Sequence, residues 1–225
     1  MEHEPFTWFG ALGLPEKIVT AGLVGAILVT FAAVVRPKLA AATAVDPEDG
    51  VTSRNIAEVF VESIAGLAEG VIGHGAERYV PLLASFFAFI LLANLIGLVP
   101  GFSPPTSDFN ITFGLGVVSF AAYQFYGARE HGAKYVKHFL GSVVFLMPLM
   151  LVVELFSHLF RPVSLGIRLF ANMFADHQVV EIFTGLTKLG IPVVFYVLGA
   201  FVAVVQAFVF TMLSAIYIAL AVSEE

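Results

Sequence analysis

The sequence contains no cysteine and few charged residues. Of its 225 residues, 12% are Asp, Glu, Lys or Arg, whereas soluble domains usually carry about 25%. The lack of cysteine excludes disulfide bonds and cysteine-ligated metal sites. The sequence also has no basic block of the kind that binds nucleic acid and no glycine-rich phosphate loop. We therefore expect no nucleic-acid partner, no bound nucleotide, no cofactor or metal, and no catalytic site in this chain.

Apolar residues make up most of what is present. They account for 59% of the chain, and the mean hydropathy is +0.92, which is typical of a polytopic membrane protein. The first residues are acidic and lack the basic region of a signal peptide. We therefore expect the first apolar run to be retained as a span, and a single transmembrane domain over residues 1–225.

Membrane spans are predicted from apolar runs, because a bilayer core of about 30 Å requires roughly 20 apolar residues in a helix. Three uncharged runs qualify, and they are Ile18–Val35, Tyr79–Val99 and Phe109–Ala128. A fourth run, Phe139–Val153, continues into a charged region, and a fifth, Leu189–Ser223, carries no charge. The sequence predicts an all-α protein with about five spans.

The last apolar run is longer than a bilayer requires. From Pro192, which suits a helix start, to Val222, a helix would extend about 46 Å. Such a helix must tilt steeply, kink or follow a curved partner. One face begins with small residues that allow close approach: Gly199, Ala203, Gln206, Phe210, Leu213 and Tyr217. We expect this face to follow a partner, although packing within the chain would also explain it.

Lysine and arginine are distributed unevenly between the loops. They occur after the first span (Arg36, Lys38, Arg54, Arg78) and after the third (Arg129, Lys134, Lys137), but not between the second and third. The positive-inside rule places the basic loops in the cytoplasm. The N-terminus and the Gly101–Asp108 turn are then expected outside, and the C-terminus in the cytoplasm.

Residues Thr52–Gly73 have the pattern of an amphipathic helix. The apolar stripe consists of Ile56, Phe60, Ile64, Leu67 and Val71, and Glu58, Glu62 and Glu69 lie away from it. This pattern favours a helix at the membrane surface. The alternative is a soluble hairpin arm.

Charged residues cluster unexpectedly between positions 154 and 181. Each costs about 2.5–3.5 kcal/mol at mid-membrane, so a functional role is presumed. Arg161-Pro162 predicts a helix break, followed by a second helix from Val163 to Thr187. On a helical wheel, that helix carries two opposed polar stripes, Arg168, Asn172, Asp176 and Val179 on one side and His177, Glu181, Thr184 and Lys188 on the other. A helix between an aqueous channel and a negatively charged partner would have this pattern.

Several of these residues also have a simpler interpretation. Arg161, beside the expected break, suits an anchoring charge. Glu154 and His158 are one helical turn apart and could satisfy each other, so the pattern alone leaves the role of Glu154 open. Gln206 could hydrogen-bond a neighbouring helix.

The Pro162–Met173 segment matches the pattern P-x-S-L-x-x-R-L-F-x-N-M, and it resembles the signature of subunit a of F-type ATP synthases. Gln206–Phe210 is similar to the Q-A-F-x-F of that family. Asn94–Gly101, Pro105–Asn110 and Ser223–Glu225 also resemble family segments, so the likeness covers the whole chain.

This resemblance implies specific roles for the charged cluster. Arg168 matches the essential arginine that faces the rotor carboxylate, and Asn172 and Gln206 match polar residues near it. Glu154 matches a carboxylate on the aqueous access path, and His177 a position on the other half-channel. Many bacterial members instead carry a small residue and Glu at positions 176–177, with His in place of Gly199. Asp176 or Glu181 is then available to supply the missing carboxylate.

The resemblance also implies a function and partners. The chain would be the proton-translocating stator subunit of the membrane sector, forming two half-channels. Its partners would be a ring of small proteolipid c subunits, the b subunits of a peripheral stalk, the soluble catalytic head and the lipid of a bacterial plasma membrane. The coupling ion, H⁺ or Na⁺, stays open because its carboxylate lies on another chain. The alternatives are a stand-alone secondary transporter, which should show inverted repeats, and a structural scaffold.

Overall fold

The computed structural model describes residues 8–10, 13, 15–41, 52–99, 101–132, 147–187 and 190–223. These residues form helices and connecting turns, with no strand among them. The α-helices are α1 (Glu16–Ala41), α2 (Ser53–Ile72), α3 (Val80–Ile96), α4 (Phe109–His131), α6 (Met147–Leu186) and α7 (Ile191–Val222), with short 3₁₀-helices η2 (Ala76–Arg78) and η3 (Pro105–Ser107). The prediction of an all-α protein is confirmed.

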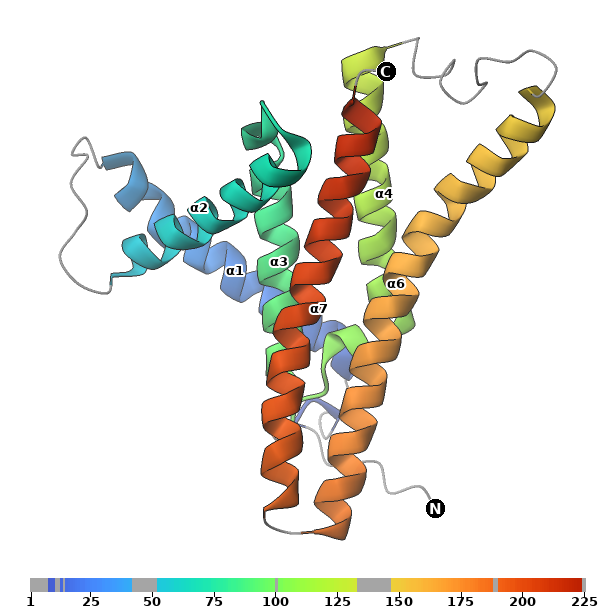
Figure 1. Cartoon of the computed structure of the whole chain (residues 1–225). Coiled ribbons are helices and arrows are strands. Elements are labelled where there is room, and N and C mark those ends of the chain that lie inside the picture. The colour runs from blue at the N-terminus through green and yellow to red at the C-terminus, as the bar shows by residue number, and fades with distance from the viewer. Residues whose placement is uncertain are drawn as a thin grey trace.

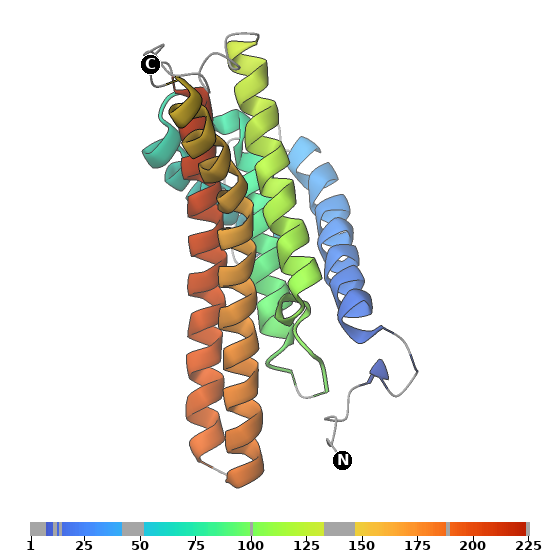
Figure 2. The same ribbon diagram turned by 90° about the vertical axis from the view of Figure 1, so that its right-hand side faces the viewer.

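The two C-terminal helices form a long antiparallel pair. Figures 1 and 2 show α6 and α7 side by side, with α3 and α4 between this pair and α1. Helix α2 lies across one end of the bundle, against α3 and α7. It therefore packs on the bundle rather than projecting from it as an arm.

Three helical segments are long and apolar enough to cross a membrane, and they are Glu16–Pro37, Phe109–His131 and Pro192–Val222. The shorter apolar helix α3 corresponds to the expected span at Tyr79–Val99. The expected run Phe139–Val153 lies largely outside the described residues, and its last part begins α6. The start of α1 and the 101–108 turn lie at the same end of the bundle, because Ser103 N donates a hydrogen bond to Glu16 Oε1 at 3.2 Å.

The predicted helix break at Arg161-Pro162 is wrong. Helix α6 runs continuously for 40 residues with Pro162 inside it, and Figure 1 shows a change of direction near its middle. Proline is tolerated in membrane helices where neighbouring helices support the backbone. Here α4 packs closely against α6, since a methyl group at Gly116 would lie 2.5 Å from the Pro162 carbonyl oxygen. The glycine allows the two helices to touch at this point.

Helix α7 begins as predicted, with Pro192 in its first turn, and extends for 32 residues. The expectation that its small-residue face follows a partner is wrong. Ala203 and Phe210 are each 1% exposed and Gln206 is 5% exposed, because this face packs inside the chain against α3 and α6. Small residues allow close approach to any helix, and here the neighbours belong to the same chain. The face open to a partner includes Phe201.

Two clusters of buried side chains hold the helices in place. The central one joins α3, α6 and α7 through Phe86, Ile90, Leu165, Leu169 and Phe210, among others. The other includes Ile64 and Ala68 of α2 packed against α3, α4 and α7. The amphipathic helix is thus confirmed, although Ile56 and Leu67, on the predicted apolar stripe, are 54% and 37% exposed. Its location at the membrane surface stays a prediction.

Candidate functional site

Arg168 lies on the exposed side of α6. The neighbouring Leu165 and Leu169 are 2% and 0% exposed, so their burial in the central cluster turns the arginine outward. Among the described residues, no carboxylate forms an ion pair with Arg168. An arginine is permanently charged, and within a membrane it requires water or an anionic partner. The exposed guanidinium of Arg168 is therefore open to water or to a negatively charged group.

An amide pair lies one helical turn from Arg168. Asn172 Nδ2 donates a hydrogen bond to Gln206 Oε1 at 2.9 Å, which joins α6 to α7. Gln206 is buried, whereas Asn172 reaches the same exposed side as Arg168. The family resemblance implied that Asn172 and Gln206 lie near Arg168, and the structure brings the three residues together at the junction of the two long helices.

The next polar residue along this side of α6 is Asp176. Its carboxylate lies directly against Gly199 of α7, where an added methyl group would be 2.6 Å from Oδ2. Glycine thus leaves the space that this carboxylate occupies. Of the two carboxylates available in the sequence, Asp176 is the one that contacts α7 at Gly199.

Asp176 and His177 line the same small pocket, which has room for about one water molecule. The helical wheel assigned these two residues to opposite stripes, and the structure corrects that grouping. The pocket lies beside α6 toward α3 and the turn before η3, so adjacent side chains about 100° apart on the helix both reach it. The remaining lining residues are Asn94, Gly97, Leu98, Pro104, Met173 and Val180.

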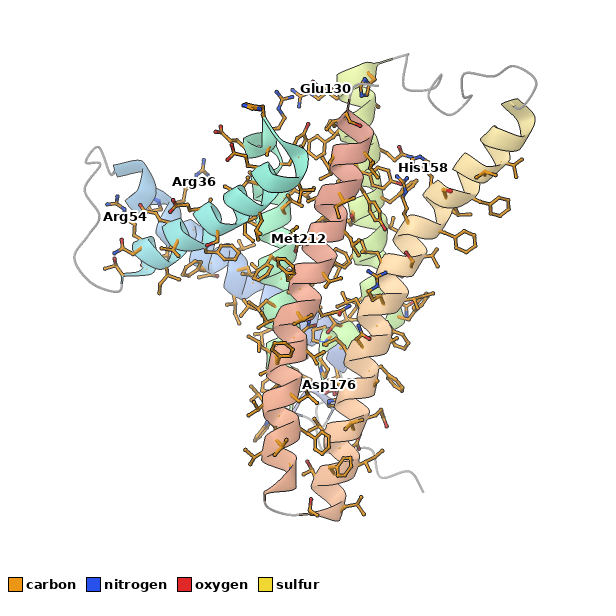
Figure 3. All side chains as sticks on the ribbon, viewed as in Figure 1. Arg36, Arg54, Glu130, His158, Asp176 and Met212 are labelled. Carbon is orange, nitrogen blue, oxygen red and sulfur yellow. The ribbon has the colours of Figure 1, made fainter. Side chains whose placement is uncertain are left out.

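Glu181 follows His177 by one helical turn and is half-buried. The start of α1 lies at the same end of the bundle, because α1 and α6 both contact η3, whose Ser107 carbonyl oxygen accepts a hydrogen bond from Lys17 Nζ. Figure 3 places Asp176 in the half of α6 that approaches α7. The polar groups therefore extend from the α1 end of the bundle along α6 toward Arg168.

Glu154 is the one predicted site residue that the structure does not join to this group. It lies in α6, well before Arg168 along the helix, and its side chain falls outside the described residues. Its predicted role on the other side of the arginine remains a prediction.

Sequence reasoning missed a hydrogen-bond network beside the pocket, in which Asn94 lines the pocket itself. Thr106 Oγ1 donates to Asn94 Oδ1 at 2.6 Å, and Asn94 Nδ2 donates to the Ala203 carbonyl oxygen at 3.3 Å. Lys17 Nζ donates to the Ser107 carbonyl oxygen at 3.2 Å and holds the turn from α1. The available signal was an amide side chain, Asn94, within an otherwise uncharged span. No group of three or more His, Asp or Glu side chains suited to a metal occurs in the described part of the chain.

The fold and the site define a class of protein. The bundle of apolar helices carries an exposed arginine with no ion-pair partner among the described residues, a partly buried amide pair, and a pocket lined by a carboxylate and an imidazole. Ionisable groups of this kind within apolar helices are typical of an ion-translocating membrane protein. The sequence profile described as ATP synthase A chain matches residues 18–219.

Individual relatives agree with this match. The chain is 45% identical to ATP synthase subunit a of Bdellovibrio bacteriovorus over 210 residues, which cover 92% of each chain. It is 40% identical to ATP synthase subunit a of Solibacter usitatus over 90% of this chain and 85% of that protein. The corresponding protein of Sorangium cellulosum is 45% identical over 78% of this chain and 69% of its own.

The chain therefore belongs to the ATP synthase A chain family. As a member of this family it is a multi-pass membrane protein, and it is the proton-translocating stator subunit of the ATP synthase membrane sector. It takes no part in the catalytic chemistry of the complex itself.

Proposed function

We propose that Arg168 separates two aqueous half-channels and faces a carboxylate of the rotor ring. The observation that carries this proposal is the exposed guanidinium beside the Asn172–Gln206 pair at the α6–α7 junction, which has no ion-pair partner in the described part of the chain. A permanent charge at this position attracts a ring carboxylate that has lost its proton. The same charge repels a proton, so it prevents a continuous path between the half-channels.

The first half-channel leads from the α1 end of the bundle to the ring. Its groups are Glu181, His177 and Asp176, the last two of which line the pocket. Asp176, rather than Glu181, supplies the carboxylate of this half-channel. Its direct contact with Gly199 of α7 supports this assignment. Asn172 and Gln206 carry the path from Asp176 to the ring site beside Arg168.

The second half-channel lies on the other side of Arg168, along the N-terminal half of α6 that carries Glu154. A proton enters through one half-channel, travels on the ring and leaves through the other. Each proton carried across the membrane yields about 2.3 kcal/mol per 100 mV of membrane potential. Rotation of the ring transmits this free energy to the catalytic head.

The ring of small proteolipid subunits packs against the exposed sides of α6 and α7. Ile167, Phe201, Val205 and Phe208 provide an apolar surface there, from 38% to 66% exposed in the chain alone. Peripheral stalk b subunits hold the chain in the assembly. The single domain, residues 1–225, lies in a bacterial plasma membrane with the N-terminus outside and the C-terminus in the cytoplasm.

Replacing the arginine tests the proposal. In inverted membrane vesicles, Arg168→Ala should abolish ATP-driven acidification while the subunit still inserts, because removal of a charge lowers the insertion cost. Passive proton leak should persist or rise. Arg168→Lys should also lose most of the ATP-driven acidification. The lysine ammonium group loses its proton more readily when desolvated, and it lacks the planar, forked set of donors of a guanidinium group.

A matched control is Arg129→Ala, which removes an exposed arginine at the end of α4 and should pump normally. Near-normal pumping by Arg168→Ala would overturn the proposal. Co-purification of a proteolipid ring and a soluble ATPase would separate it from a stand-alone transporter. Comparing pumping with and without Na⁺ identifies the coupling ion.

A further inference from the structure

A second buried polar cluster lies away from the pocket. The Tyr123 hydroxyl on α4 and His158 Nδ1 on α6 are hydrogen-bonded at 3.1 Å. Tyr123 is 1% exposed and His158 is 7% exposed. Figure 3 shows His158 in the half of the molecule opposite Asp176. The path proposed above uses neither residue.

A cation is stacked on the same cluster. The guanidinium carbon of Arg161 lies 5.8 Å from the centre of the Tyr123 ring and 5.3 Å from that of Tyr217 on α7. Cation–π contacts of this kind are strongest where water is excluded. Three helices therefore meet at one polar point, with α6 contributing both His158 and Arg161. This contact agrees with an anchoring role for Arg161.

Beyond this cluster, α6 diverges from its neighbours. Figure 1 shows its N-terminal half leaning away from α4 and α7. Val152, Val153 and Phe156 in that half are between 50% and 54% exposed. The direction of this half therefore depends on the contacts at its base, where His158 and Arg161 lie.

We propose that His158 is a positioning residue whose hydrogen bond to Tyr123 sets the direction of the N-terminal half of α6. A hydrogen bond between buried groups is directional and is costly to leave unmade. It restricts the helix in a way that apolar packing alone would not. Given the proposed function, the pair determines where Glu154 stands relative to the ring, and thus the second half-channel.

Substitutions can separate the hydrogen bond from the rings and from proton transfer. Tyr123→Phe removes the hydroxyl and keeps the ring under Arg161. His158→Asn keeps a polar group at the position of Nδ1 but cannot titrate, and His158→Leu removes both properties. Tyr126→Phe is the matched control, because Tyr126 lies on the same helix, packs edge-on against Tyr79, and has no hydroxyl hydrogen bond within the described residues.

The direct measurement is hydrogen exchange of the assembled complex in detergent, followed by mass spectrometry. Peptides covering residues 147–160 should exchange faster in Tyr123→Phe and His158→Leu, while peptides from α1 and α3 stay unchanged. Tyr126→Phe and His158→Asn should resemble the native protein. Unchanged exchange at residues 147–160 in Tyr123→Phe would overturn the inference whatever the outcome at Arg168.

Pumping by inverted vesicles supplies the second readout. Tyr123→Phe should slow ATP-driven acidification roughly three- to tenfold, as expected for the loss of one buried hydrogen bond, and His158→Asn should restore most of the rate lost in His158→Leu. Equal failure of the asparagine and leucine variants would assign a proton-carrying role to His158 and overturn the positioning role. Normal pumping by Arg168→Ala would instead refute the proposed function, and the exchange result would still decide this inference.

Discussion

The carboxylate of Asp176 and the α-carbon of Gly199 form a close complementary contact between α6 and α7. A methyl group on Gly199 would lie 2.6 Å from Asp176 Oδ2 and 3.1 Å from Leu98 Cδ2. The aspartate therefore depends on the absence of a side chain on the opposite helix. A titratable side chain at one of these two facing positions therefore leaves room for only a small residue at the other.

Gly199→Ala tests this contact. The added methyl group should displace the Asp176 carboxylate, and ATP-driven acidification should fall several-fold. Subunit levels should remain near normal, because the displaced atom is at the end of a flexible side chain. Gly114→Ala is the control, since an added methyl group there meets no atom within 4 Å. Equal pumping by the two variants would exclude a role for the placement of the carboxylate.

His177→Leu should strongly slow proton flow while the complex still assembles, because it removes the imidazole from the pocket wall. Passive proton flux through vesicles stripped of the catalytic head measures this step. His74→Leu, at an exposed histidine beside η2, should leave the flux unchanged. A proton flux in His177→Leu equal to that of the native protein would mean that protons pass by way of Asp176 without His177.

The exposed face of α7 should contact the ring. Cysteines at Phe201, Val205 and Phe208 should form disulfide cross-links to cysteines introduced on the outer helix of a proteolipid subunit. Ala203→Cys and Phe210→Cys are the controls, because both native side chains are 1% exposed and turned toward α3 and α6. Cross-links from the buried pair alone would mean that α7 is rotated in the assembled complex.

The two ends of α4 should lie on opposite sides of the membrane. Asn110 and Arg129 are exposed near its start and its end, and the chain has no native cysteine. With an impermeant thiol reagent, Asn110→Cys should react from outside and Arg129→Cys from the cytoplasm. The reverse result would invert the orientation, and reaction of both from one side would exclude α4 as a span.

Composition and local pattern were sufficient to predict most helices. Apolar runs indicated α1, α3, α4 and α7 because a long uncharged segment has few alternatives to a helix in a bilayer. The start of α7 at Pro192 could also be predicted, because proline has a local backbone preference for the first turn of a helix. The segment around Arg168 was identifiable because a charge inside an apolar region is costly wherever it packs.

Other features were decided only by tertiary structure. Pro162 stays inside α6, and it packs closely against Gly116 of α4, a neighbour that lies 46 positions away in the sequence. The small-residue face of α7 turns inward because α3 and α6 cover it. Periodicity reports which side of a helix is apolar or small, but not which chain covers that side.

The same limit applies to the polar groups. The sequence by itself determined that Arg168, Asp176 and His177 lie on one membrane helix. Only the packing of α3, α7 and the turn before η3 brought Asp176 and His177 to one pocket, and only the meeting of α4 with α6 paired Tyr123 with His158. Such pairs depend on interatomic distances between helices, and a helical wheel contains no information about the neighbouring helix.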